Sequence, residues 1–294
     1  MNSDAPPDTA KELDTIAYNL LKGAKALGVY PTPIDRIVAE AELSIDHGVD
    51  LSRIEPSFLR RFGAGFSRTM KKFLGICDIR QKVIYLDHSQ KESRNNFIIL
   101  HETVHGVSPW QRDLLAAMDD EQSLDPDVKE IFEREANYGA SSLLFQLNHF
   151  DDEAAKLPLT IKSPHALAQK FGSSAHAAIR RYVQRSAKRC AVLVLHPPEK
   201  NGQYGARPRN YFQSESFTAE FGQISWPEFC AWDFPFVVDL KFKRRLHETG
   251  KILLLTANGS IEFEYHFFNS TFNAFIFMLP KGEHIRSRVR IVER

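Results

Sequence analysis

The sequence predicts an α+β protein, in which a mainly helical N-terminal part with a short sheet precedes a strand-rich C-terminal domain. Apolar residues recur at helical spacing through most of the first 190 residues. Beyond residue 190, where 13 of the 22 phenylalanines lie, apolar residues instead fall in short alternating runs at 252–255, 261–266 and 274–278. Runs of this kind are typical of strands with one buried face. The 294 residues suffice for two or three domains of ordinary size.

Apolar spacing and helix-capping residues place the individual elements. Residues 73–79 and 82–86 are rich in β-branched and aromatic side chains and predict a hairpin, and an acidic connection follows at 119–121. Small polar residues at helix starts predict N-caps at Thr32, Ser93, Asp125, Ser163 and Ser174. The predicted helices cover residues 10–27, 33–43, 56–72, 93–106, a stretch from Asp125-Pro126 through Leu143, and two short segments within 163–186.

Composition and charge exclude several classes of protein. Hydrophobic residues are 43%, charged residues are 26% and the net charge is +1, which excludes a disordered polyelectrolyte and a protein that coats nucleic acid over its whole surface. No apolar run reaches the roughly 18–20 residues that span a bilayer, and no secretory signal is visible. Cys77, Cys190 and Cys230 are too scattered for a disulfide framework or a thiolate zinc site. We therefore expect a soluble, cytoplasmic protein.

A His-Glu-x-x-His motif lies inside the predicted helix at 93–106. His101 and His105 are four residues apart, so on a helix their side chains share one face at a separation of about 6 Å. Two imidazoles at this spacing can bind one tetrahedral zinc ion. Glu102 is rotated by about 100° from His101 and can act as general base for the attacking water without binding the metal. The alternative is a pair of surface histidines on an amphipathic helix.

A third metal ligand is available on the next predicted helix. Glu133 lies 28 residues after His105, and Asn137 follows one turn later on the same face. Glu133 would complete a His-His-Glu set that leaves the fourth position open, and Asn137 would then hydrogen-bond a ligand histidine. Glu135 points about 160° away from Glu133, whereas Glu130 lies on nearly the same face. Helical phase leaves Glu130 open as the alternative, although only Glu133 has an asparagine one turn on.

Three consecutive pieces of the chain resemble the IrrE/ImmA-type zinc metallopeptidases, a family that includes radiation-response regulators. The matching pieces are Phe-Leu-Gly-Ile-Cys-Asp-Ile-Arg-Gln-Lys-Val-Ile-Tyr-Leu-Asp at 73–87, the helix with the histidine motif, and Glu-Arg-Glu-Ala-Asn at 133–137 with the stretch through Leu144. The resemblance covers roughly residues 30–190. It implies one zinc ion per chain, held by His101, His105 and Glu133, with Glu102 as general base. It also implies that the strand at 82–87 is an edge strand that holds an extended substrate.

The chain departs from the family pattern at a few positions. Many members have glycine just before the second histidine, where this chain has Val104. Many continue Ala-Asn-x-Phe-Ala and close the helix with proline, where this chain has Tyr138-Gly139 and then Phe145-Gln146. These departures leave the predicted metal ligands in place and change the predicted surroundings of the substrate.

A second motif, at 163–181, resembles a helix-turn-helix. Gly172 would make the turn between two short helices, and Ala168 and Ile179 would pack them together. Arg180, Arg181 and Arg185 make the end of the second helix basic and predict a docking or phosphate-contacting face. The second helix begins with alanines rather than with side chains that read bases, so the alternative is a helical pair that only packs on the rest of the protein.

These observations combine into one predicted organisation and function. We expect a zincin-like metallopeptidase domain at 1–155, a helix-turn-helix-like segment at 156–189 and a strand-rich, GAF-like sensor domain at 190–294. The resemblance implies a zinc-dependent endopeptidase that cleaves a helix-turn-helix repressor of the XRE type in a stress or DNA-damage response. The alternative is a DNA-binding or ligand-sensing transcriptional regulator with a vestigial metal site. We expect weak or absent DNA binding and no membrane association.

Overall fold

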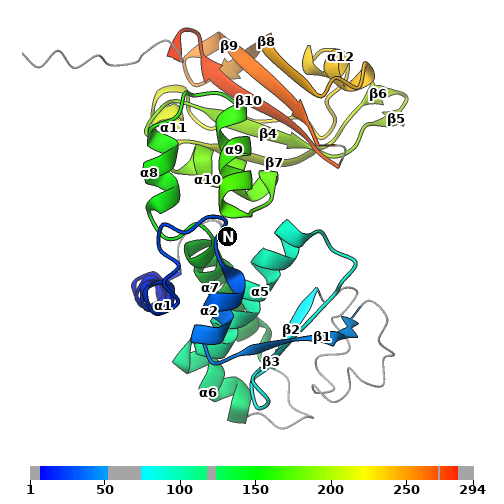
Figure 1. Cartoon of the computed structure of the whole chain (residues 1–294). Coiled ribbons are helices and arrows are strands. Elements are labelled where there is room, and N and C mark those ends of the chain that lie inside the picture. The colour runs from blue at the N-terminus through cyan, green and yellow to red at the C-terminus, as the bar shows by residue number, and fades with distance from the viewer. Residues whose placement is uncertain (1–6, 52–73, 118–123, 271, 284–294) are drawn as a thin grey trace, which may run out of the picture. The chain divides into compact units, whose positions relative to one another are not determined.

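The computed structural model describes residues 7–51, 74–117, 124–270 and 272–283 (Figure 1). The chain divides into two compact units, of which the first comprises residues 1–150 and 169–174 and the second comprises 151–168 and 175–294. Each unit contains helices and a sheet of its own, which confirms the predicted α+β class. The helix predicted at 56–72 and the acidic residues at 119–121 lie outside the described residues.

Helices make up most of the described part of the first unit. They include α1 (Ala10–Gly23), α2 (Ile34–Glu40), α5 (Glu92–Val107), α6 (Pro109–Ala117) and α7 (Pro126–Leu144). The predicted histidine-motif helix is α5, which packs against α7, and α7 in turn packs against α1. The buried residues Leu100 and Val104 of α5 and Ala136 and Ala140 of α7 belong to the core of this helix cluster. Helix α6 was not predicted.

The predicted N-caps are right at Asp125 and wrong at three other positions. The Asp125 side chain accepts a hydrogen bond from the backbone N–H of Asp127, and Pro126 follows at the first helical position. Thr32 and Ser163 instead use their hydroxyls as donors, to the carbonyl oxygens of Leu144 and Pro158. Helix α5 begins one residue before Ser93, and no side chain caps it. Thr32 therefore makes a tertiary hydrogen bond and Ser163 a local one, instead of capping a helix.

A three-stranded sheet accompanies these helices, with strand order β1-β3-β2. Strands β2 (Gly75–Asp78) and β3 (Val83–Leu86) form the predicted antiparallel hairpin, and β1 (Ser44–Asp50) pairs with β3 in parallel. The expectation that the strand at 82–87 is an edge strand is therefore wrong, because β3 is paired on both sides. Among the described strands, β1 and β2 form the two edges of this sheet.

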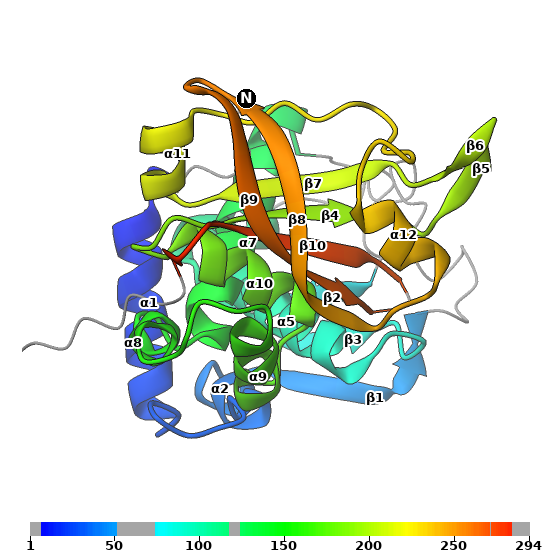
Figure 2. The ribbon, with the colours of Figure 1, turned by 90° about the horizontal axis from the view of Figure 1, so that it is seen from above.

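The second unit is built on a five-stranded antiparallel sheet with strand order β7-β4-β10-β9-β8. Figure 2 shows β8 and β9 running into one another as a long hairpin. The five strands are β4 (Ala191–Leu195), β7 (Pro208–Gln213), β8 (Leu246–Thr256), β9 (Gly259–Asn269) and β10 (Ala274–Pro280). The predicted apolar runs lie in β8, β9 and β10. The small pair β5 (Glu199–Asn201) and β6 (Gln203–Gly205) and the helices α11 (Glu215–Phe221) and α12 (Phe236–Lys241) complete this region.

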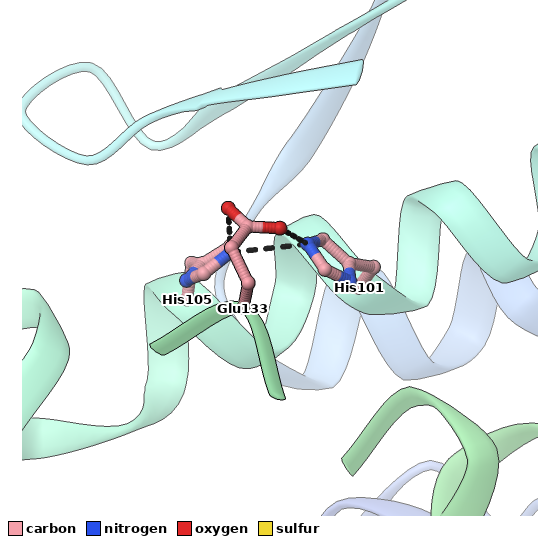
Figure 3. A group of neighbouring side chains, drawn as sticks. All are labelled: His101, His105 and Glu133. Atoms are coloured by element: carbon pink, nitrogen blue, oxygen red, sulfur yellow. Dashed lines mark hydrogen bonds and ion pairs between the residues drawn. The ribbon is translucent and has the colours of Figure 1, made fainter. Parts of the chain in front are cut away.

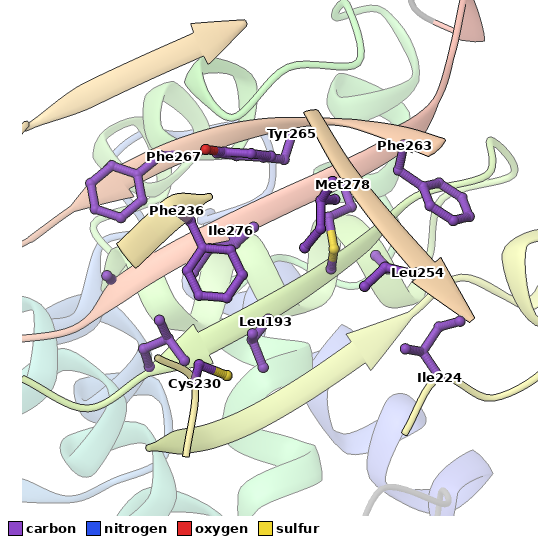
Figure 4. Close-up of a cluster of buried hydrophobic side chains, with 14 of the residues drawn as sticks. Leu193, Ile224, Cys230, Phe236, Leu254, Phe263, Tyr265, Phe267, Ile276 and Met278 are labelled. Atoms are coloured by element: carbon purple, nitrogen blue, oxygen red, sulfur yellow. The ribbon is translucent and has the colours of Figure 1, made fainter. Parts of the chain in front are cut away.

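Aromatic and aliphatic side chains fill the core on one face of the five-stranded sheet (Figure 4). Phe263 packs against the rings of Phe217 and Phe221, at centroid separations of 5.3 and 5.0 Å. Phe236 from α12 and Tyr265 from β9 lie in the same cluster. Part of the concentration of phenylalanine beyond residue 190 thus lies in this sheet-based core, whereas Phe242 and Phe272 are exposed.

Three further helices lie between the two sheets in sequence, namely α8 (His149–Ala155), α9 (Lys162–Phe171) and α10 (Ala175–Gln184). Gly172 has φ of +71° in the turn between α9 and α10, as the sequence predicted. Ala168 and Ile179 are both buried. In the described part of the chain, no helix combines the length and the apolar character that crossing a membrane requires.

Candidate metal centre

The predicted metal ligands lie together between α5 and α7 (Figure 3). The Nε2 atoms of His101 and His105 are 3.2 Å apart. Glu133, from α7, places Oε2 at 3.3 Å from Nε2 of His101 and Oε1 at 4.0 Å from Nε2 of His105. The potential ligand atoms of the three residues all lie within 4.8 Å of one another. Two helices that are apart in sequence therefore converge on one point.

The close approach of α5 and α7 depends on Gly139. A Cβ atom at this position would lie 2.7 Å from Cγ2 of Val104, which is closer than real Cβ atoms approach. The two departures from the family pattern are therefore complementary, because the larger Val104 on α5 faces a residue with no side chain on α7. This fit preserves the helix separation that brings Glu133 to the histidines.

Each histidine has a second contact on the side away from the convergence point. Nδ1 of His101 lies 3.2 Å from Oδ1 of Asn137. Nδ1 of His105 lies 2.6 Å from Oε1 of Gln111, a fully buried residue of α6. Both imidazoles are thus engaged through Nδ1 and present Nε2 to the shared point.

This donor set fits a divalent cation such as zinc. Two imidazole nitrogens face one another at 3.2 Å, and a carboxylate lies beside both. If both imidazoles are neutral and protonated on Nδ1, the facing lone pairs repel unless a cation or a proton lies between them. Two imidazoles and one carboxylate are a common catalytic zinc set, which leaves a position for water or substrate.

The charges of the cluster shift the pKa values of its members. Burial opposes protonation of His101, but its hydrogen bond with Glu133 and the charges of Glu102 and Glu133 outweigh burial and raise its pKa. Burial, aided by the charge of His101, lowers the pKa of His105 to about 4. Burial would raise the pKa of Glu133, but its hydrogen bond and charge interaction with His101 lower it. These directions describe the group without a bound ion.

Glu102 is placed beside the three ligands without being one of them. Its neighbour on the sheet side is Gly75 of β2, where an added Cβ would overlap Ile98 and lie 3.1 Å from Cγ of Glu102. Burial raises the pKa of Glu102 to about 7. A carboxyl that titrates near neutrality is suited to accept and return a proton under physiological conditions.

The alternative third ligands lie elsewhere on α7. Glu130 is exposed and does not belong to the convergent group. Glu135 points to the other side of the helix, where its buried carboxylate accepts hydrogen bonds from Trp110 and Gln111. Glu133 is the acidic residue of α7 that the structure brings to both histidines.

Of the three predicted arginines, Arg180 and Arg181 lie on α10 and Arg185 directly follows it, and the structure gives each a neighbour within the second unit. Arg181 donates from Nε and Nη2 to both carboxylate oxygens of Asp151, at 3.0 and 3.1 Å. Nε of Arg185 lies 3.9 Å from the same carboxylate. The guanidinium of Arg180 lies over the ring of Phe212 at 5.0 Å. The suggested docking or phosphate-contacting role of these arginines stays a prediction.

The sequence reasoning missed Gln111 and its neighbour Trp110. Both lie on α6, which was not predicted. The pair Ser108-Pro109 is the polar-residue-plus-proline pattern that often opens a helix, and it could have indicated α6. Nothing local in the sequence indicates that a glutamine six residues after His105 turns back to contact it.

Comparisons with known proteins found a domain family, a relative and a solved structure that are similar to this chain. Residues 64–182 match the model of the IrrE N-terminal-like domain, Peptidase_M78. The chain is 26% identical over 197 residues to the radiation response metalloprotease IrrE of Deinococcus deserti, covering 64% of this chain and 70% of that protein. Its fold is similar to that of a solved Mycobacterium tuberculosis transcriptional regulator, with a TM-score of 0.50, 13% identity and coverage of 91% of this chain and 86% of that one. Over residues 64–182, the chain is therefore similar to the IrrE N-terminal-like domain of the Peptidase_M78 family.

Proposed function

We propose that this chain is a zinc-dependent endopeptidase with one zinc ion per chain. The observation that carries the proposal is the convergence of His101, His105 and Glu133 on one point, with their ligand atoms within 4.8 Å. A zinc ion bound there would polarise the scissile carbonyl and make water a better nucleophile near neutral pH. The family supports the same activity, since the matching model is a peptidase domain.

The other residues around the site have separable roles. Glu102 takes a proton from the attacking water and delivers it to the leaving amine nitrogen, because it lies beside the three ligands without being one of them. Asn137 orients His101 through Nδ1. The two histidines on α5 and Glu133 on α7 would hold the zinc ion, and Gly139 allows these two helices to pack closely.

Strand β2 is the proposed binding site for an extended substrate. Among the described strands it pairs with β3 alone, and on its other edge the backbone N–H of Cys77 hydrogen-bonds Glu102. Gly75 brings β2 against α5 next to Glu102. A peptide that added to this edge by main-chain pairing would pass beside the general base. This assignment replaces β3, which is paired on both sides.

We further propose that the substrate is a helix-turn-helix repressor of the XRE type, cleaved in the cytoplasm during a stress or DNA-damage response. The support is the family resemblance and the likeness to a radiation response metalloprotease. Residues 190–294, which contain the five-stranded sheet, are the proposed GAF-like sensor that would adjust this activity.

Incubation of the purified zinc-loaded chain with purified XRE-type repressors tests the proposal, with fragments identified by mass spectrometry. Glu102→Gln should keep its zinc and lose cleavage by a factor of about 10²–10⁴, because the amide cannot accept the proton. Replacing Arg180, Arg181 and Arg185 by alanine should leave cleavage of a short peptide intact. A cellular response that survives Glu102→Gln but disappears with the arginines would instead establish a non-proteolytic, DNA-binding regulator.

A further inference from the structure

A chain of hydrogen bonds through the buried side chain of Gln111 connects His105 to a carboxylate outside the metal centre. Gln111 is fully buried, and its Oε1 atom lies 2.6 Å from Nδ1 of His105. Its Nε2 atom donates to Oε2 of Glu135 at 2.5 Å. Trp110 Nε1 donates to the same oxygen at 2.8 Å, and the Thr9 hydroxyl donates to Oε1 of Glu135 at 2.6 Å.

These contacts fix which way the Gln111 amide points. The indole N–H of Trp110 can only donate, so Oε2 of Glu135 is an acceptor. The Gln111 atom that faces this oxygen must therefore be the amide nitrogen, and the amide oxygen must face His105. An amide oxygen can only accept a hydrogen bond, so the donor in the contact with His105 is the Nδ1–H of the imidazole.

We propose that Gln111 is a positioning residue that holds His105 in the Nδ1–H tautomer, and that Glu135 acts through Gln111 by fixing its orientation. In this tautomer the lone pair of His105 lies on Nε2, the atom that faces His101 and Glu133. This proposal rests on the proposed metal site and adds residues that neither the histidine motif nor the acidic third ligand includes. Hydrogen-bond partners of ligand histidines typically alter metal affinity by 10–100-fold.

The tautomer can be measured without any metal. In the metal-free wild-type protein labelled with ¹⁵N-histidine, two-bond ¹H–¹⁵N correlation at pH 7.5 should show His105 as the Nδ1–H form. A histidine free in water prefers the other tautomer, so this result requires an acceptor at Nδ1. An Nε2–H pattern for His105 in the wild-type protein would overturn the proposal.

Zinc affinity gives the second readout, by competition with a chromophoric chelator. Gln111→Met keeps a similar length but removes both hydrogen-bonding atoms. It should weaken zinc binding by about 10–100-fold and allow His105 to adopt the Nε2–H tautomer. Gln146→Met is the matched control, since Gln146 is also fully buried in the first unit but bonds to Gly28, Val29 and Thr32 instead. It should change zinc affinity by less than about twofold.

The outcomes separate this proposal from the proposed function. Unchanged zinc affinity in Gln111→Met, or an equal loss in Gln146→Met, would show that Gln111 has no specific positioning role. A Gln111→Met variant that fails to fold leaves the wild-type tautomer measurement as the deciding test. A wild-type protein that binds no zinc would refute the metallopeptidase function, whereas the tautomer of His105 would still decide the role of Gln111.

Discussion

In the first unit, amide and carboxylate side chains lie among the buried helices, whereas in the second unit aromatic rings cover the face of a sheet. Gln111, Glu135 and Gln146 are each almost fully buried, and each has hydrogen-bond partners in another element or loop. In the second unit the largest fully buried side chains are Tyr265 and six phenylalanines, namely Phe217, Phe236, Phe263, Phe267, Phe275 and Phe277.

The difference shows two ways of fixing a structure. Apolar burial is non-directional and stabilises in proportion to area, so the second unit gains stability from the volume of its rings. A buried polar group costs free energy unless its hydrogen bonds are made, so it selects the one arrangement that makes them. The first unit uses such groups around the candidate metal centre, where the positions of individual atoms matter for chemistry.

The largest effect on stability is expected from removing one ring from the aromatic core of the second unit. Phe263 is fully buried and lies against Phe217 and Phe221. Phe263→Ala should lower the free energy of unfolding by about 3–5 kcal/mol, through lost apolar burial and the cavity left behind. Urea denaturation followed by circular dichroism measures this. A loss below 1 kcal/mol would mean that the rings do not provide the main stability of this unit.

Gln146→Met should lower the stability of the first unit. The substitution removes three hydrogen bonds, which join Gln146 to the N–H of Gly28, the carbonyl of Val29 and the hydroxyl of Thr32, and each contributes about 0.5–1.5 kcal/mol. We expect a total loss of about 2–4 kcal/mol in the same denaturation experiment. A neutral result would contradict the view that polar contacts organise this unit.

Gly139→Ala should be disruptive through packing rather than hydrogen bonding. The new methyl group would press on Val104 at 2.7 Å, and overpacking of this kind typically costs about 1–3 kcal/mol. Adding Val104→Ala should recover part of this loss, which a double-mutant cycle would detect. Strictly additive effects would show that the two positions do not compensate.

The smallest expected effect is on how the stability of the second unit depends on pH. His176 packs near the rings of Phe212 and Phe275, and burial, with the charges of Arg209 and Arg180, lowers its pKa despite a hydrogen bond with Asn210. A depressed histidine pKa stabilises the fold above the unfolded value near 6.5 and loses that contribution as the pH falls below it. His176→Phe should therefore flatten the decline in stability between pH 6.5 and 5. An unchanged slope would exclude His176 as its source.

The sequence predicted the fold where local signals were strong. The apolar stripe of α5, the Asp125-Pro126 start of α7 and the alternating runs of β8, β9 and β10 all indicated the observed elements. Strand β1 was missed because residues 44–50 carry little apolar alternation and are mostly polar or exposed. That omission explains the wrong edge strand, since β1 is the element that pairs with the far side of β3.

The candidate site was predictable to the extent that helical phase determines it. Spacing alone placed His101 and His105 together and put Glu133 and Asn137 on one face. Phase could not exclude Glu130, because that choice depends on how α7 is rotated against α5. The contact of Gln111 with His105 could not be predicted, because it follows from the turn between α5 and α6 rather than from helical spacing.

Zinc binding by matched glutamate variants tests the central claim most directly. Wild type, Glu133→Ala and Glu130→Ala are loaded with zinc, dialysed and compared by native mass spectrometry and chelator competition. We predict one zinc ion per chain with equal affinity in wild type and Glu130→Ala, and a loss of at least about tenfold in Glu133→Ala, which lacks one of three protein ligands. Retention of zinc by Glu133→Ala with loss in Glu130→Ala, or absence of zinc from the wild type, would contradict the account.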